Sequence, residues 1–316
     1  HYCSRRQRQM CIRDRNILEN DMEAVEQMSF LNIGDKKIKY NNMSVLQAGF
    51  NTIGLDKFVK IFQENDYTTV IYEQDSPGEN ATRSLSQIIS PGTYIDDDTS
   101  SISNVTLCIW IEHTKSRKKM KESITFGVSS LDIFTGMTTL FETTIDHNHS
   151  PNSYDQLEQQ VSIYNPKETI LISNLDINTI NDIKIYIGLE DNKCYIVEHT
   201  KEEFLLSKYV VNSFKQNYQL EILLKYFPNV PNDIIESELI YGFGLGLQCF
   251  IVLLDYMYEH NCDFIKKLYY PEFTHNQNKL VLANYSLKQL NIIDDNRHTG
   301  KLKSVGNFLN NCCLLY

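Results

Sequence analysis

The pattern of apolar residues between positions 104 and 197 constrains the fold of this chain more than any other feature. Two stretches, at 105–111 and 123–129, alternate apolar and polar residues with the period of two that is typical of β-strands, and 136–141 is a third expected strand after a turn. A helix-like spacing follows, and then a strand, a second helix and a last strand. The first helix carries Tyr154, Leu157, Val161 and Tyr164, and the later strands occupy 169–172 and 194–197. The alternation in the first strand predicts that it buries only one face.

This order of elements is that of a ribonuclease-H-like α/β layer, in which helices cover a sheet. We therefore predict a domain of this type over residues 104–212. A smaller mixed α/β unit is predicted before it, over 16–98. Its elements are a helix at 20–30, a helix with Leu55, Phe58, Val59 and Phe62 on one face, strands at 68–73 and 83–89, a turn at Ser90–Thr93 and an acidic linker at Asp96–Asp98.

From residue 213 onward the pattern is helical, so we predict the start of a truncated all-α domain over 213–316. One long helix is expected between Asp233 and His260. No strand precedes the glycines inside it, which favours close helix packing over a dinucleotide-binding loop (Gly242, Gly244 and Gly246). A short strand at 279–283 and a helix near Ser304 follow. The predicted fold class is thus α/β and α multi-domain.

The formal net charge of −10 argues against a protein that coats itself in nucleic acid, because phosphate binding depends on clustered Lys and Arg. Local contact with DNA stays possible. No stretch reaches the roughly 18 apolar residues that span a bilayer, so we expect a soluble, intracellular protein without a membrane partner. Nuclear, organellar, cytoplasmic and viral origins stay open. The eight cysteines form no CxxC pair, which favours reduced core thiols over a disulfide framework or a zinc site.

The first fifteen residues differ in composition from the rest of the chain. They contain five of its eight arginines and show no helical or strand periodicity. We interpret residues 1–15 as a non-native or artefactual segment, with a basic nucleic-acid arm as the alternative. The closing residues, NNCCLLY, stop inside an apolar helical pattern. We expect the chain to be truncated at both ends.

Three stretches together resemble the MutS family of DNA mismatch repair proteins, in the order that this family shows. The first is similar to the second half of the mismatch-binding domain and contains AGF (48–50), EQ (73–74) and SPGT (90–93). The second resembles the connector domain, where Asp132, Thr135 and Gly136 occupy a D-x-S-T-G-like turn. The third, at 278–294 and 304–312, looks like the entry to the core domain. The resemblance covers about residues 16–314.

The resemblance implies DNA mismatch recognition in DNA repair, by a fragment of an ATP-dependent protein. The implied partners are double-stranded DNA with mismatches or small loops, a second MutS-like subunit in a homodimer or heterodimer, and a downstream repair factor. Family members wedge the phenylalanine of a Phe-x-Glu motif into the base stack, but no such motif lies before Asn20 here. No G-x-x-x-x-G-K-[ST] loop occurs in the chain. We expect no catalytic, metal or cofactor site in this fragment, whereas the full-length protein would bind ATP and magnesium and act as a DNA-dependent ATPase.

Two residues of the first unit are candidates for contact with DNA. Arg83 matches a basic position of the family, where positive charge neutralises backbone phosphate without reading sequence. Gln87 falls where some members carry Arg, and its amide can still donate to a phosphate oxygen. The alternative for Arg83 is a solvated strand residue, and Gln87 lacks the charge that Arg would supply at its position. Glu73 and Gln74 are expected to fix the loop beside them rather than to contact DNA.

Two other functions compete with this one. Ribonuclease-H-like nucleases hold two divalent metals with several carboxylates on adjacent strands. Here only Glu112, at the end of the first strand, and Asp132, after the second, are available. The resemblance implies instead that Asp132 caps its turn. The third reading is a protein–protein interaction module of a repair complex, which the acidic balance permits.

Overall fold

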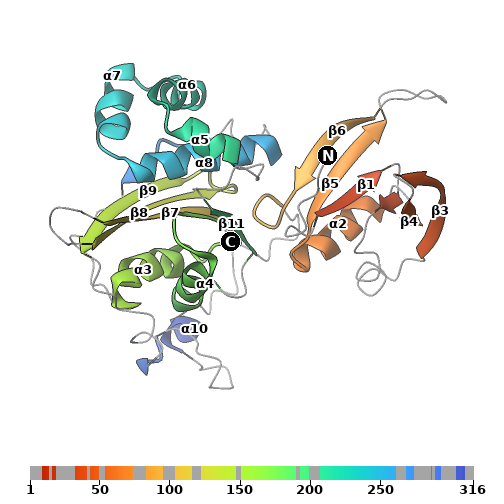
Figure 1. Ribbon diagram of the computed structural model, residues 1–316, viewed down its shortest axis with the longest axis horizontal. Helices are drawn as coiled ribbons and strands as arrows, with labels where there is room; N and C mark the ends of the chain where they lie inside the picture. The colour runs from red at the N-terminus through yellow and green to blue at the C-terminus, as the bar shows by residue number, and fades with distance from the viewer. Residues whose placement is uncertain are drawn as a thin grey trace.

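The computed structural model describes residues 9–13, 16–18, 33–40, 43–49, 54–74, 83–94, 104–115, 122–146, 151–189, 193–198, 207–260, 268–273, 286, 289–292 and 304–309. The strands form two six-stranded sheets (Figure 1). The helix predicted at 20–30, the linker at Asp96–Asp98 and the strand predicted at 279–283 lie outside the described residues. The mixed α/β class that the sequence predicts is confirmed.

The first sheet has the strand order β3-β4-β2-β1-β5-β6. Its strands are β1 (Gln9–Arg13), β2 (Asn16–Leu18), β3 (Ile33–Tyr40), β4 (Met43–Gly49), β5 (Thr68–Gln74) and β6 (Arg83–Ile89). β1 and β5 pair in parallel, and the other neighbours are antiparallel. The helix α2 (Leu55–Glu64) buries Val59 and Phe62, as its apolar stripe predicts.

β1 lies in the arginine-rich segment, where the sequence shows no strand periodicity. It is an inner strand, paired with β2 on one side and with β5 on the other. Inner strands often read as short apolar runs, such as residues 10–12 here, and not as an alternation of apolar and polar residues. Whether residues 1–15 belong to the natural protein stays a prediction.

The second sheet has the order β11-β10-β7-β8-β9-β12. Its strands are β7 (Val105–Lys115), β8 (Glu122–Asp132), β9 (Thr138–Asp146), β10 (Glu168–Ser173), β11 (Lys193–Glu198) and β12 (Glu272–Phe273). β7, β8 and β9 form an antiparallel meander, and β10 continues the sheet parallel to β7. The short 3₁₀ helix η2 (Pro151–Tyr154), α3 (Asp155–Tyr164) and α4 (Ile177–Tyr186) complete the predicted order of elements.

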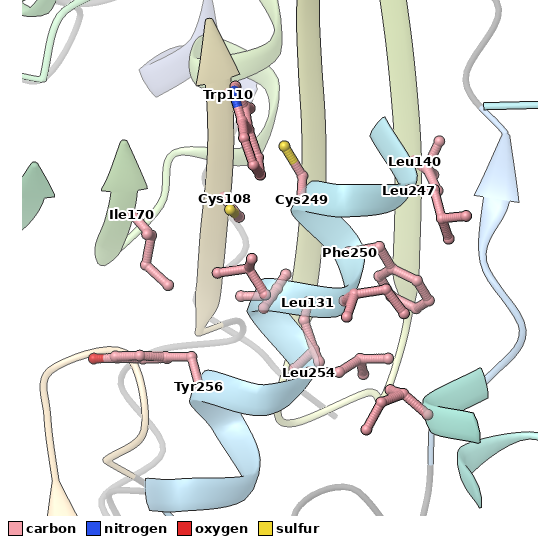
Figure 2. Close-up of a cluster of buried hydrophobic side chains, with 14 of the residues drawn as sticks. Cys108, Trp110, Leu131, Leu140, Ile170, Leu247, Cys249, Phe250, Leu254 and Tyr256 are labelled. Carbon is pink, nitrogen blue, oxygen red and sulfur yellow. The ribbon is translucent and has the colours of Figure 1, made fainter. Parts of the chain in front are cut away.

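The prediction that β7 buries only one face is wrong. Its first seven residues, 105–111, are all buried. Leu107, Ile109 and Ile111 pack in one cluster with α3 and α4. Cys108 and Trp110 point to the opposite face, where Figure 2 shows them beside α8 (Leu245–His260). The polar positions of the alternation are therefore covered by a helix that follows more than 130 residues later in the chain.

The long helix predicted between Asp233 and His260 is also wrong, because the segment is broken. It consists of α7 (Asn232–Ile234), the π-helix η3 (Ile235–Ile240) and α8, and the two halves meet at 118°. Glycine is a poor helix former, and two glycines lie at the break. One carboxylate oxygen of Glu142 accepts hydrogen bonds from the backbone N–H groups of Gly244 and Gly246, each at 2.8 Å. The Glu142 side chain of β9 therefore binds the backbone N–H groups at the amino-terminal end of α8.

The helices after residue 207 share the core of the second sheet. α5 (Ser207–Ser213), α6 (Gln216–Tyr226) and α8 cover the face opposite α3 and α4 (Figure 1). A Cβ at Gly246 would lie only 2.9 Å from a Leu140 methyl group, which confirms the close packing predicted for this glycine. We expected a separate helical domain from 213, but residues up to 260 pack on this sheet, and β12 joins its edge. The domain limits at 98, 104 and 212 stay predictions.

The last described helix, α10 (Val305–Leu309), agrees with the helix predicted near Ser304. Among the described helices, none alone is long and apolar enough to cross a membrane. The segments Asn232–Ile240 and Leu245–His260 meet the criteria of length and composition only as a bent pair.

Candidate nucleic-acid interface

The two predicted DNA-contacting residues lie on β6, the edge strand of the first sheet. Arg83 is its first residue and pairs with Gln74, and Gln87 pairs with Ile71. The register shifts between these two pairs, so β6 contains one extra residue. Such a bulge bends a strand and interrupts its alternation of faces. Consistent with this, three consecutive residues, 84–86, are exposed, and Gln87 is half-buried.

The structure therefore places Arg83 and Gln87 on the same edge strand, four residues apart. Edge strands present polar backbone groups outward, which suits contact with a phosphate backbone as well as with water. Glu73 and Gln74, which were expected to fix the adjacent loop, pair with Ser84 and Arg83 at the base of that loop. That loop, residues 75–82, lies outside the described part of the chain.

β6 leads directly into the SPGT turn, which is closed by its own groups. The backbone N–H of Thr93 donates to the carbonyl of Ser90 at 2.9 Å, and the N–H of Ser90 donates to Oγ1 of Thr93 at 2.8 Å. Pro91 at the second position fixes φ near the value that such a turn requires. The turn predicted at Ser90–Thr93 is thus confirmed, and both hydroxyl side chains are buried.

Glycine is required at position 92 of this turn because there is no space for a side chain. It does not have a positive φ, so its backbone conformation suits other residues too. A Cβ at this position, however, would lie 2.5 Å from Oγ1 of Thr106 and 2.6 Å from Oε2 of Glu168. The Thr106 hydroxyl donates to the carbonyl of Gly92 at 3.2 Å. The turn therefore presses against β7 and β10 of the second sheet.

Glu168 is the centre of this contact. It is the first residue of β10 and is fully buried, with 0% of its surface exposed. Its Oε2 accepts a hydrogen bond from the Ser90 hydroxyl at 2.6 Å and another from the Gly92 N–H at 3.0 Å. A carboxylate is costly to bury, and these two donors reduce that cost at Oε2, whereas Oε1 is buried without a hydrogen-bond partner. We call this set, Glu168, Ser90, Gly92 and Thr106, the junction cluster.

Two tyrosines enclose the junction cluster. The Tyr195 hydroxyl shares a hydrogen bond of 2.9 Å with Thr68 of β5, and the Tyr256 hydroxyl of α8 donates to Ser90 at 3.4 Å. Burial raises the pKa of both phenols well above the usual value, and the charge of Glu168 raises it further. Both hydroxyls therefore stay protonated at neutral pH. These uncharged hydroxyls therefore join the second unit to Thr68 and Ser90 of the first unit by hydrogen bonds.

Asn104 and Asp132 hold the same turn from another side. The side-chain amide of Asn104 donates to the carbonyls of Pro91 at 3.1 Å and of Tyr94 at 2.9 Å. Oδ1 of Asp132 accepts from the backbone N–H of Asn104 at 3.3 Å and from that of Phe134 at 3.0 Å. The capping role predicted for Asp132 is confirmed.

The geometry does not support a metal site from the two carboxylates of the nuclease alternative. Glu112 pairs with Thr125, whereas Asp132 lies seven residues further along β8. At about 3.4 Å per residue, this separates them by roughly 24 Å, far more than a two-metal site spans. In the described ranges, no group of three or more His, Cys, Asp or Glu side chains is placed to hold a metal ion.

Sequence reasoning found the turn but missed the residues that anchor it. Glu168, Tyr195 and Tyr256 come from three separate elements of the second unit. One signal was present: the carboxylate of Glu168 directly precedes the apolar run TILI of an inner strand. A charge at the start of such a strand indicates a buried partner.

Comparison with known proteins finds similarity in sequence to a viral protein. No family model matches the chain. It is 28% identical over 310 residues to a putative DNA mismatch repair protein, a mutS homolog, from Acanthamoeba polyphaga mimivirus. The alignment covers 92% of this chain and 27% of that protein, so the chain spans about a quarter of the relative's length. This similarity supports a MutS-like relationship.

Solved structures show only weak similarity. A Fowlpox virus resolvase in complex with Holliday junction DNA matches with a TM-score of 0.26 and 12% identity, over 48% of this chain and 96% of the resolvase. NurA matches with a TM-score of 0.13 and 10% identity, over 59% of this chain and 62% of NurA. These scores are too low to assign a fold or a function.

Proposed function

We propose that this chain supplies the DNA-binding and connector regions of a MutS-like protein that recognises mismatched DNA during repair. The observation that carries the proposal is the 28% identity to the mimivirus mutS homolog, which extends over 92% of the chain. The motifs AGF, EQ, SPGT and D-x-x-T-G lie within this span. The substrate class is double-stranded DNA with mismatches or small loops.

The topology of the second unit supports its assignment as a ribonuclease-H-like connector. Five of its strands lie in the order β9-β8-β7-β10-β11, and β8 runs antiparallel to its neighbours, whereas β10 and β11 run parallel to β7. Helices cover both faces of this sheet, as expected of such a layer. The first unit, around the sheet that ends in β6, is proposed as the mismatch-binding domain.

The edge strand β6 is the proposed place of contact with the DNA backbone. Arg83 would neutralise a phosphate, and the Gln87 amide would donate to a phosphate oxygen. Such contacts position a protein on the duplex and do not read its sequence. Preference for a mismatch would then come from the ease with which a mispaired site is deformed.

ATP does not enter the proposed role of this chain. Its sequence contains no G-x-x-x-x-G-K-[ST] loop, so its residues do not fit the phosphate site of such an ATPase. We propose that ATP and magnesium binding, and pairing with a second MutS-like subunit, involve the rest of a longer protein. ATP hydrolysis by this chain alone would contradict that division.

The proposal is tested by binding of the chain to two labelled duplexes that differ in a single G·T mispair. Fluorescence anisotropy at about 50 mM and about 200 mM salt gives the affinity for each duplex and its dependence on ionic strength. We expect tighter binding of the mismatched duplex at both salt concentrations, and weaker binding of both duplexes at the higher one. Equal affinity for the two duplexes, or no binding at low salt, would overturn the proposal.

A further inference from the structure

We infer that Glu168 is a positioning residue, which sets the angle of the β6 edge relative to the second sheet through the SPGT turn. The inference rests on the proposed function, because it assigns to Glu168 the control of the strand that would meet DNA. It also makes a claim about geometry that does not need DNA. The argument starts from the hydrogen bonds of the turn.

The second unit supplies hydrogen-bond partners to several polar groups of this turn. The Gly92 N–H donates to Glu168, and the Gly92 carbonyl accepts from Thr106. The Pro91 carbonyl accepts from Asn104. Leaving buried backbone groups without hydrogen-bond partners costs free energy. The turn therefore has one favoured position and orientation on the second sheet. A loose contact between two domains would instead leave these groups to water.

Glu168 holds the turn through two hydrogen bonds that converge on one carboxylate oxygen. Oε2 accepts from the Ser90 hydroxyl and from the Gly92 N–H, which are two residues apart. The two bonds fix the orientation of the turn as well as its distance. The tightness of the site reinforces this, since a Cβ at Gly92 would fall 2.6 Å from the same oxygen.

The turn lies at one end of β6. A small change in its orientation would therefore move the other end of the strand by several ångströms. β6 runs from Arg83 to Ile89 and enters the turn at Ser90. At about 3.3 Å per residue, Arg83 lies roughly 23 Å from Ser90 along the strand, and a tilt of about 10° would move it by roughly 4 Å. A displacement of that size would remove a phosphate contact. Removing the carboxylate should therefore affect DNA binding without touching the DNA-facing residues.

The first unit is tied to this turn from its own side as well. The side-chain amide of Gln63 on α2 donates to the carbonyl of Ile89 at 3.2 Å and to the Thr69 hydroxyl at 3.1 Å. β5, β6 and α2 therefore move together. Other connections between the units remain without Glu168, so its loss should loosen the units and not separate them. They are the Tyr195–Thr68 bond and the bonds of Asn104, Thr106 and Tyr256 to the turn.

The experiment measures the distance between the units in the free chain. Spin labels are introduced as unnatural amino acids at two exposed positions, Ser86 of β6 and Asp182 of α4, which leaves the eight native cysteines in place. Double electron–electron resonance then gives the distribution of distances. The variants are Glu168→Ala, which removes the acceptor, and Glu168→Gln, which keeps an acceptor oxygen of the same reach.

The matched control is Glu158→Ala. Glu158 lies on α3 and is also a buried glutamate of the second unit, with 2% of its surface exposed, but it does not belong to the junction cluster. We expect Glu168→Ala to broaden or shift the distance distribution, Glu168→Gln to restore most of it, and Glu158→Ala to leave it as in the wild type. The affinity for both duplexes should fall by about tenfold in Glu168→Ala alone, because the contact that is lost is to backbone phosphate.

Ser90→Ala covers the case in which Glu168→Ala does not fold. It removes one of the two donors to the carboxylate and adds no atoms, so we expect a smaller broadening in the same direction. An unchanged distance distribution in Ser90→Ala and in every folded Glu168 variant would overturn the inference, even if the wild type prefers mismatches. If the wild type shows no such preference, the proposed function fails, whereas the distances still decide the role of Glu168.

Discussion

β6 and β7 follow one another in the chain, yet they are opposite kinds of strand. β7 is an inner strand of its sheet with seven consecutive buried residues, whereas β6 is an edge strand with three consecutive exposed ones. The SPGT turn lies between them in sequence and packs against the start of β7 at Thr106 and of β10 at Glu168. The buried inner strand stabilises the fold, whereas the edge strand carries the residues that we propose as the contact with DNA. Stability and binding should therefore respond to different mutations.

The largest expected difference comes from the same substitution made in both strands. Leu107 of β7 is 0% exposed, and Leu85 of β6 is 49% exposed. Leu107→Ala leaves a cavity between the sheet and its helices and should lower the free energy of unfolding by about 2–5 kcal/mol. Leu85→Ala should change it by less than about 0.5 kcal/mol. Urea unfolding followed by circular dichroism measures both, and similar losses would contradict the comparison.

A smaller effect is expected at the turn between the two strands. Gly92→Ala inserts a methyl group against Thr106 and Glu168, with no room for it, and should cost about 1–3 kcal/mol. The control is Gly244→Ala, where the nearest atom beyond the adjoining backbone is a Glu142 oxygen at an ordinary 3.5 Å. Both variants are compared by thermal and urea unfolding. If Gly92→Ala is as stable as the control, the turn does not press on the second sheet.

The elements of both strands could be predicted from the sequence, but their surroundings could not. Period-two alternation located β7, and the run Arg83–Ile89 with the turn after it located β6. The burial of both faces of β7 depends on α8, and no local pattern in β7 indicates a helix so far along the chain. The break before α8 depends on Glu142 of β9, which lies 102 residues before Gly244.

The candidate interface was predictable in part, for a similar reason. Arg83 and Gln87 were found by resemblance, and the structure places them on an exposed edge. The junction cluster was not found, because the bond from Ser90 to Glu168 joins residues 78 positions apart. Packing of apolar residues produces a periodic pattern in the sequence, but a hydrogen bond between two hydrophilic residues does not.

The smallest effect on the free energy of unfolding is expected at high pH, from a cysteine of the second sheet. Burial raises the pKa of the Cys194 thiol of β11 to about 11 from 9.0. Since the pKa is higher in the folded state, the stability contributed by the protonated thiol is complete below about pH 9 and is lost as the pH rises towards 11. Cys194→Ala should therefore lose less stability than the wild type between about pH 8 and about pH 10.5.

Unfolding of the wild type and the variant at both pH values measures this difference, because other groups titrate equally in the two proteins. Equal losses would show that the Cys194 thiol is not shielded from water. No cysteine lies in β6, so this alkaline effect cannot arise from the edge strand itself.

The most direct test of the central claim is the salt dependence of DNA binding after a single charge is removed from β6. Arg83→Gln is compared with Lys57→Gln, which removes an exposed charge from α2 in the same unit. If Arg83 neutralises a phosphate, the slope of log affinity against log salt on a mismatched duplex should fall by about 0.9 in Arg83→Gln and stay unchanged in Lys57→Gln. The same slope in both variants and the wild type would contradict the assignment of β6 as the DNA-contacting edge.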